Sequence, residues 1–174
     1  MKITSKKTSV TLSLMGIILL VGFDQLCKYL AVLHLQDAED VTLIKGVLTL
    51  HYLENFGAAF GSFQGATIGF LILTVAFLGL LSYIVWKIPM ERKYLALRLV
   101  TMVFAAGAIG NFVDRLAHRY VIDFIYFCLI DFPVFNVADI YVTCSCIVFI
   151  FLFLFYYKDQ DFDFLKKQRE DKVK

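Results

Sequence analysis

The chain has 174 residues, of which 60% are hydrophobic, and its mean hydropathy is +0.74. Soluble domains contain roughly 45–50% apolar residues, so this composition argues against a soluble globular protein. It indicates a single polytopic membrane domain over residues 1–174, with little room for a separate soluble core. The formal net charge of +2 points to no class of partner, but the placement of the charges does carry information.

Four stretches are long and apolar enough to cross a bilayer core, which takes about 20 mostly apolar residues. They lie near residues 12–35, 67–86, 95–116 and 138–157. The first follows Lys2, Lys6 and Lys7, as the apolar region of a signal peptide would, but no small-residue cleavage site comes after it. We therefore expect a retained span.

Lysine and arginine are distributed unevenly among the connections. Most lie before the first span, between the second and third, and after the fourth, whereas the other two connections hold few, among them Lys45 and Arg119. The positive-inside rule predicts cytoplasmic termini, with residues 36–66 and 117–137 on the outer side. Residues 158–174 are expected to form a charged cytoplasmic tail.

The outer connection 36–66 contains the pattern of a short β-hairpin. The segment "VTLIKGVLTLHYLENF" is rich in Val, Leu, Thr and Tyr, and Gly46 divides it. It ends in "NFGAAFGSF", where small residues allow close approach of a backbone. The predicted fold class is an all-α membrane protein with four transmembrane helices, both termini cytoplasmic, and a small extracytoplasmic β-sheet and flap.

The first span contains an acid and a base one helical turn apart. Asp24 and Lys28 lie on the same face of the expected helix, because residues four apart are neighbours there. An internal ion pair would lower the cost of placing both charges in the membrane. A structural pair that fixes the helix bundle explains this spacing at least as well as direct chemistry does.

The outer end of the third span carries a polar cluster. Asn111, Asp114 and Arg115 follow Gly107 and Gly110, which form a small-residue face suited to close helix contact. The side chains of Asp114 and Arg115 either reach the membrane interface or, together with Asn111, form a polar wall for a site.

Three acids, Asp123, Asp131 and Asp139, stand in an aromatic and branched apolar segment where carboxylates are costly. Asp123 falls in the last outer connection, and Asp139 begins the fourth span, where Asn136 can cap the helix. Capping alone explains one isolated acid. Two acids at one membrane depth can also share a proton, one drawing a proton from water while the other polarises a carbonyl. That is aspartic peptidase chemistry, which needs no metal or cofactor.

The sequence gives little support to other catalysts. His34, His51 and His118 are scattered, so no metal site is expected, and no P-loop, Rossmann or Gly-x-Ser-x-Gly pattern occurs. No basic-aromatic face for nucleic acid is found. Two non-enzymatic alternatives stay open: a transporter or channel subunit, which usually places its carboxylate mid-membrane, and a structural or assembly protein whose acids are caps and interface anchors.

Five motifs, in order across the four spans, resemble those of lipoprotein signal peptidase, the bacterial signal peptidase II family. They are Asp24-Gln25-x-x-Lys28, Asn55-x-Gly57-Ala58-Ala59-Phe60, Gly110-Asn111-x-x-Asp114-Arg115, Val121-Ile122-Asp123-Phe124 and Phe135-Asn136-x-Ala138-Asp139. Any one motif is weak, but the ordered set is specific. Cys27 and Ala106 stand where a small hydroxyl residue and a glycine are common, which concerns local packing only.

The resemblance implies a multi-pass enzyme of the bacterial inner membrane that cuts diacylglyceryl-modified prolipoproteins just before the lipidated cysteine, on the extracytoplasmic side. It implies that Asp123 and Asp139 are the catalytic pair. Four residues are implied to bind substrate or support the pair: Asn55, Asn111, Arg115 and Asn136. Four are implied to support the architecture: Asp24, Lys28, Gly57 and Asp114.

The expected partners are prolipoprotein substrates, membrane lipid and globomycin-type inhibitors, and a monomer is expected. Asp131 matches no motif of the family, and we expect it to lie in water at the edge of the last outer connection.

Overall fold

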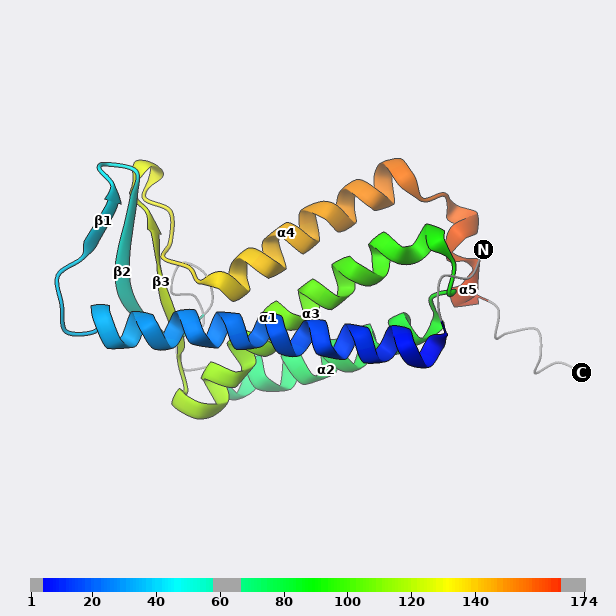
Figure 1. The fold of residues 1–174 in the computed structure, drawn as a ribbon, viewed down its shortest axis with the longest axis horizontal. Helices are drawn as coiled ribbons and strands as arrows, with labels where there is room; N and C mark the ends of the chain where they lie inside the picture. The colour runs from blue at the N-terminus through cyan, green and yellow to red at the C-terminus, as the bar shows by residue number, and fades with distance from the viewer. Residues whose placement is uncertain (1–4, 58–66, 167–174) are drawn as a thin grey trace, which may run out of the picture.

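The computed structural model describes residues 5–57 and 67–166. Its long helices are α1 (Lys6–Leu35), α2 (Thr67–Lys87), α3 (Leu95–His118) and α4 (Val137–Phe151), and a π-helical segment, Leu152–Tyr156, continues α4. Four helical segments are long and apolar enough to cross a membrane. α1 begins and α4 ends at one end of the molecule, where α2 also ends and α3 begins, whereas the strands lie at the other end (Figure 1).

These helices confirm the four predicted spans with small shifts of their bounds. α1 begins earlier than residue 12 because Ser5 caps it, its hydroxyl accepting a hydrogen bond from the Thr8 backbone N–H at 3.1 Å. α3 continues to His118 and ends where Arg119 adopts a left-handed conformation, with φ of 73°. α4 begins after Asn136, the residue predicted to cap it.

The predicted outer sheet has three antiparallel strands in the order β1 (Val41–Ile44), β2 (Leu48–Asn55) and β3 (Val121–Phe127). Gly46 has a φ of 72° in the turn between β1 and β2, which confirms the hairpin and explains the glycine. After β3, a 3₁₀ turn (Cys128–Ile130) reverses the chain. Phe135 then exchanges backbone hydrogen bonds with Ile125 of 2.8 and 3.0 Å, so the start of α4 lies beside β3.

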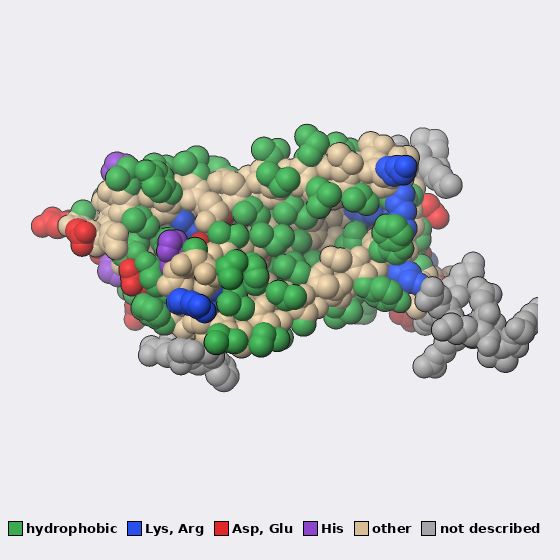
Figure 2. All heavy atoms as spheres, turned by 90° about the horizontal axis from the view of Figure 1, so that it is seen from below, with side chains coloured by type: hydrophobic (Ala, Val, Ile, Leu, Met, Phe, Trp, Pro, Cys, Tyr) green, Lys and Arg blue, Asp and Glu red, His purple; other side chains and the backbone are tan. Residues whose placement is uncertain are grey.

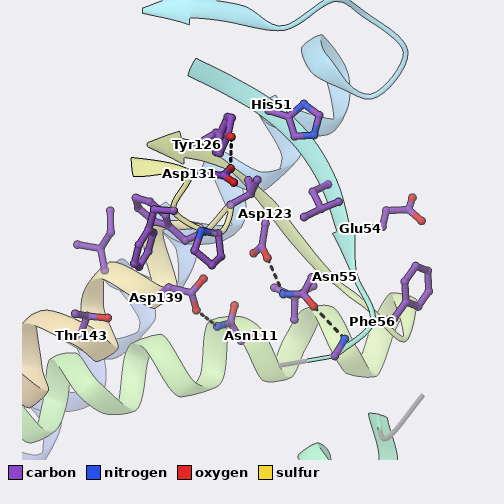
Figure 3. Close-up of a pocket in the computed structure, with 18 of the residues that line it drawn as sticks. His51, Glu54, Asn55, Phe56, Asn111, Asp123, Tyr126, Asp131, Asp139 and Thr143 are labelled. Carbon is purple, nitrogen blue, oxygen red and sulfur yellow. Dashed lines mark hydrogen bonds between the residues drawn. The ribbon is translucent and has the colours of Figure 1, made fainter. Parts of the chain in front are cut away.

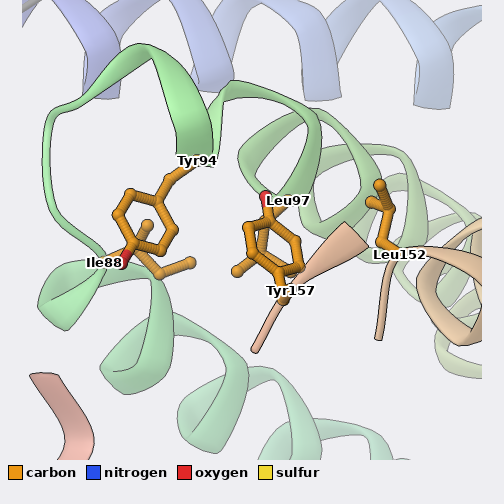
Figure 4. Packing of buried hydrophobic residues seen from close by; sticks show 5 residues of the cluster. All are labelled: Ile88, Tyr94, Leu97, Leu152 and Tyr157. Atoms are coloured by element: carbon orange, nitrogen blue, oxygen red, sulfur yellow. The ribbon is translucent and has the colours of Figure 1, made fainter. Parts of the chain in front are cut away.

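Two clusters of buried apolar residues hold the ends of the molecule. At the sheet end, Ala31 and Leu35 of α1 pack with Ile122 and Phe124 of β3. At the opposite end, the aromatic rings of Tyr94 and Tyr157 stack 5.8 Å apart between their centroids (Figure 4). Two short helices after α4, η5 (Asp159–Phe162) and α5 (Asp163–Lys166), contribute Phe162 and Phe164 to that cluster.

The membrane helices expose apolar side chains along their length, as a surface in lipid does. Ile72, Leu73 and Phe155 are each at least 65% exposed. Figure 2 shows hydrophobic side chains over the middle of one face, with Lys and Arg gathered at the end opposite the sheet. Because lipid tails are as apolar as leucine, the helices gain by close packing rather than by apolar burial.

Close packing between α3 and α4 depends on the two predicted glycines. A Cβ on Gly107 would lie 2.5 Å from the Ala138 carbonyl oxygen, and one on Gly110 would lie 2.6 Å from an Asp24 carboxylate oxygen. The small-residue face is therefore confirmed, and it brings α1, α3 and the start of α4 together.

Part of the predicted outer connection lies outside the described residues. The "NFGAAFGSF" segment is described only to Gly57, so the predicted flap, along with Lys2 and residues 167–174 of the tail, falls outside them.

Candidate active site

Asp123 is the acid that β3 contributes, and its side chain is 1% exposed. Its strand partner on β2 is Leu53. Asn55 lies two residues further along β2 and therefore on the same face of the sheet. The Asn55 side-chain amide donates to Asp123 Oδ2 at 2.9 Å, and that of Asn136 donates to Oδ1 at 2.6 Å.

Asp139 is the acid that α4 contributes, in the first turn of the helix. It forms a capping box with Asn136: the Asp139 backbone N–H donates to Asn136 Oδ1 at 3.0 Å, and Asp139 Oδ2 accepts from the Asn136 backbone N–H at 3.1 Å. Its other oxygen accepts from the Asn111 side-chain amide at 2.8 Å. The helix start thus fixes the direction of this carboxyl group.

Asn136 joins the two acids, because it holds both of them at once. Its side chain bonds Asp123, while its backbone bonds Asp139. The fold makes this possible by pairing Phe135 with β3 immediately before α4 begins. Two carboxyl groups 16 positions apart in the chain are therefore held by one fully buried residue.

A buried ionic network lies directly behind the two acids. Lys28 of α1 contacts Asp24 at 3.0 Å and Asp114 at 2.8 Å, and none of these side chains is more than 1% exposed. Lys28 also donates to Asn111 Oδ1 at 3.0 Å. Since Asn111 Oδ1 receives Lys28 and the Asn136 amide, its own amide nitrogen must face Asp139.

Charges are segregated between the two layers of the site. The lysine is bonded to Asp24 and Asp114, whereas the described donors to Asp123 and Asp139 are amides. Amide donors position a carboxyl group without a full positive charge that would favour its ionised form. This environment suits a pair in which one member holds a proton while the other is ionised.

Both carboxyl groups line the same open cavity of about 1350 Å³, which runs from α3 and α4 to the outer strands (Figure 3). Arg115 also lines it and donates to the Gly57 carbonyl at 3.2 Å, while the Gly57 N–H donates to Asn55 Oδ1 at 3.0 Å. The arginine thus holds the chain just after β2, and through it the asparagine that bonds Asp123.

The electrostatic environment changes the acidity of Asp123. Burial, and then the negative charge of Asp139, raise its pKa to about 7, although the hydrogen bonds from Asn55 and Asn136 oppose this. A carboxyl group with this pKa can hold a proton near neutral pH. The pair should be treated as a single titrating unit.

The structure brings together all ten residues to which the family resemblance assigned a catalytic, binding or architectural role. They fall into two groups. Six meet at the cavity: Asn55, Gly57, Asn111, Arg115, Asp123 and Asp139. The other four lie behind or between them: Asp24, Lys28, Asp114 and Asn136. The alternative that Asp114 reaches the membrane interface is wrong, because its side chain is buried against Lys28 and accepts from the Ile122 backbone N–H.

Two further residues clarify the site. Asp131 is exposed at the cavity rim, as expected, and accepts a 2.6 Å hydrogen bond from Tyr126. Gln25 received no role from sequence, yet its amide donates to Asp114 at 2.8 Å and to the Gly110 carbonyl at 3.3 Å. The sequence signal that could have indicated this role was its position beside Asp24 in the first motif. Within the described residues, no group of His, Cys, Asp or Glu is arranged to hold a metal ion.

This geometry can be compared with known proteins. A family model described as Signal peptidase (SPase) II matches residues 16–155. The chain belongs to the signal peptidase II family. Two relatives named Lipoprotein signal peptidase, from Streptococcus pyogenes serotype M5 (strain Manfredo) and serotype M18 (strain MGAS8232), are each 40% identical over 132 residues. Those residues make up 76% of this chain and 86% of each relative.

Two solved structures, described as bacterial membrane enzymes, resemble this signal peptidase II chain. One, at 2.3 Å resolution, has a TM-score of 0.74 and 30% identity, covering 83% of this chain and 88% of that one. The other, at 1.9 Å, has a TM-score of 0.72 and 29% identity, covering 85% and 96%. The predicted family, its aspartic-type peptidase class and the four-helix membrane fold are confirmed. Both non-enzymatic alternatives are wrong.

Proposed function

We propose that this chain removes the signal peptides of diacylglyceryl-modified prolipoproteins, cutting before the lipidated cysteine with Asp123 and Asp139 as its catalytic pair. Membership of the signal peptidase II family supports the reaction. The observation that carries the residue assignment is the shared hold of Asn136 on both carboxyl groups in one open cavity.

The proposed reaction needs one ionised and one protonated carboxyl group. The ionised member takes a proton from a water molecule, whose oxygen attacks the carbonyl carbon of the scissile peptide bond. The protonated member donates to the carbonyl oxygen as negative charge develops there. When the resulting tetrahedral intermediate collapses, the C–N bond breaks and a carboxyl group returns a proton to the leaving amine.

The surrounding amides and arginine orient the reacting groups. Asn55 and Asn111 each donate to one acid, so they fix where the two carboxyl oxygens point. Arg115 lines the cavity and already donates to two backbone carbonyls, those of Gly57 and Asn111. We expect its remaining donors to bind carbonyl groups of the substrate.

The cavity lies where a lipid-anchored substrate would present its cleavage site. It opens among the outer ends of α3 and α4 and the strands, at the end of the molecule with few basic residues. By the positive-inside rule, we expect this end of the molecule to face the extracytoplasmic side. Acyl chains on the substrate cysteine stay in lipid, which holds the scissile bond near this depth and confines the search to the membrane plane.

Replacing either acid by asparagine tests the assignment. In a bilayer-reconstituted assay with a diacylated prolipoprotein, we expect Asp123→Asn and Asp139→Asn each to lower the cleavage rate by at least about 10³-fold, because the water loses its base or the carbonyl its acid. Cleavage is followed as a mobility shift on a gel. Unlipidated precursor should be cut poorly.

Asp131→Asn is the matched control, since Asp131 lines the same cavity but is exposed and bonded to Tyr126. It should retain cleavage within a fewfold of the unmodified chain. Full activity of Asp123→Asn or Asp139→Asn would refute the catalytic pair. We further expect globomycin-type cyclic peptides to block the cavity, and the chain to act as a monomer.

A further inference from the structure

A second cavity, of about 270 Å³, lies away from the two acids. It is enclosed by the first half of α1, the second half of α2 and the first half of α3, at the end of the molecule opposite the sheet. Its wall is largely apolar, with Leu14, Ile17 and Leu81 among the lining residues. Arg98 and Lys6 add positive charge to this lining.

Among the described residues, Arg98 lacks the anionic partner that a buried arginine needs. Its side chain is only 9% exposed, and Nη2 donates to the Ile88 carbonyl. Its Nε is buried without a hydrogen-bond partner, and no acid forms an ion pair with it, within residues 5–57 and 67–166. An unpaired guanidinium in a membrane helix is costly unless an anion or other acceptor compensates it.

Other positive charge reinforces this site. The Lys6 ammonium lies 3.5 Å from the centroid of the Trp86 ring, which holds it at the cavity wall. Lys and Arg side chains gather at the same end in Figure 2. Basic pockets between transmembrane helices at the cytoplasmic side suit acidic lipid head groups.

We propose that this cavity binds one anionic phospholipid, with its phosphate at Arg98 and Lys6 and the start of an acyl chain along the apolar wall. The volume is slightly below the ~300 Å³ of small-molecule pockets, so it suits a head group and part of one chain rather than a whole lipid. The basic N-terminal region of a signal peptide would be repelled, which disfavours the substrate as occupant.

The chain carries its own reporter for this site. Trp86 is the only tryptophan of the sequence, and it lines the cavity. In bilayers containing phosphatidylglycerol or phosphatidylcholine with brominated chains at equal mole fraction, surrounding lipid quenches the exposed part of Trp86 equally in both cases. A lipid bound in the cavity adds quenching that depends on its head group, and this difference is the readout. We expect the cavity to prefer phosphatidylglycerol over phosphatidylcholine by at least about fivefold. That is the factor that one basic residue near the charge of the lipid head group would give.

Two variants separate loss of the site from loss of the fold. Arg98→Gln removes the guanidinium, and Ser13→Phe fills the cavity without changing charge. Each should reduce the preference to about onefold. Arg92→Gln, at an exposed arginine of the same end that does not line the cavity, should retain it. Size-exclusion profiles and thermal unfolding identify any variant that fails to fold, in which case the other one decides.

Three results would overturn the proposal. One is equal quenching by the two brominated lipids in the unmodified chain. The second is the same preference in Arg98→Gln as in Arg92→Gln. The third is a preference that appears only after removal of residues 167–174, which would assign the cavity to the chain's own tail. Cleavage activity is not part of the measurement, so its outcome is independent of the proposed peptidase function.

Discussion

At the residue scale, the site separates charges that must be paired from acids that must remain able to exchange a proton. Lys28 is bonded to Asp24 and Asp114, whereas Asp123 and Asp139 receive amide donors. Among the described hydrogen bonds, Asn111 links the lysine to the acid pair, because its oxygen accepts from Lys28 and its amide nitrogen donates to Asp139. We infer that the ionic layer orients the pair without ionising both of its members.

The raised pKa of Asp123 predicts how cleavage depends on pH. Below about pH 7 this carboxyl group holds its proton, and above about pH 7 it loses it. Because the reaction needs one protonated member, the cleavage rate should fall about tenfold per pH unit on the alkaline side. A pH–rate profile of the reconstituted enzyme checks this, and a rate still rising at pH 9 would contradict it.

The raised pKa of Asp123 also predicts how the stability of the fold depends on pH. An unfolded aspartate ionises near pH 4, so between about pH 4 and 7 the folded chain binds one more proton than the unfolded chain. This contribution to stability is therefore lost as the pH rises through that window. Asp123→Asn should remove this part of the slope in thermal unfolding measured across the same pH range.

Removing Lys28 should destabilise the fold strongly. Lys28→Met leaves Asp24 and Asp114 buried without their cation, and breaking one partner of a buried ion pair typically costs about 3–5 kcal/mol. Lys7→Met, at an exposed lysine of the same helix, should change the free energy of unfolding by less than about 0.5 kcal/mol. Denaturant unfolding in detergent compares the two, and equal effects would argue against the network.

At the element scale, the site depends on how closely α4 approaches α3 and α1. The backbone N–H of Ala138, in the first turn of α4, donates to Asp24 at 2.8 Å, and Ala138 lies against Gly107 and Gly110. The strand β3 then meets the start of α4 through Phe135. Each acid is thus placed by an element that is itself held by backbone contacts.

A methyl group at the helix contact should separate these elements. Gly107→Ala places a Cβ 2.5 Å from the Ala138 carbonyl oxygen, and we expect a loss of about 1–3 kcal/mol together with reduced cleavage, because α4 carries Asp139. Gly79→Ala is the control, since a Cβ there meets no atom of the described residues within 4 Å. It should leave unfolding and cleavage unchanged or slightly stabilise α2.

At the scale of the whole molecule, the chain has two chemically different ends. Basic residues gather where α1 begins and α4 ends. The acid pair lies at the sheet end, in β3 and the first turn of α4. The helices between them present apolar side chains to their surroundings. This polarity supports the proposal that the cavity faces away from the cytoplasm.

Thiol labelling in intact cells tests that orientation. In a background without the four native cysteines, Glu39→Cys stands in the outer connection and Glu91→Cys between α2 and α3, and both positions are exposed. In intact cells, a membrane-impermeant maleimide should label the Glu39→Cys variant and not the Glu91→Cys variant. The Glu91→Cys variant should be labelled once the cells are opened. The reverse pattern would place the acid pair on the cytoplasmic side.

Sequence predicted best what depends on local patterns. Hydropathy located the four spans, Gly46 the hairpin turn, and Asn136 the cap of α4. The common membrane depth of Asp123 and Asp139 suggested that they act together, and the family resemblance implied that they are the catalytic pair. No local pattern shows that Phe135 returns to Ile125, the contact that brings them together.

The other contacts of the site could not be predicted from sequence, because they join residues of different helices. The spacing of Asp24 and Lys28 indicated an ion pair, but Asp114 as a second partner comes from another helix. Arg98 was overlooked, although an arginine inside an apolar stretch is itself a signal of function. That none of the described acids pairs with it becomes visible only when the neighbouring helices are in place.

The double use of Asn136 also limits how the chain can change. Aspartate at this position would still cap α4 but would add a negative charge between two acids, and serine would cap the helix but is too short to bond Asp123. Few substitutions at Asn136 can therefore keep both the start of α4 and the arrangement of the two acids, so we expect inhibitors that depend on this arrangement to meet few resistance mutations there.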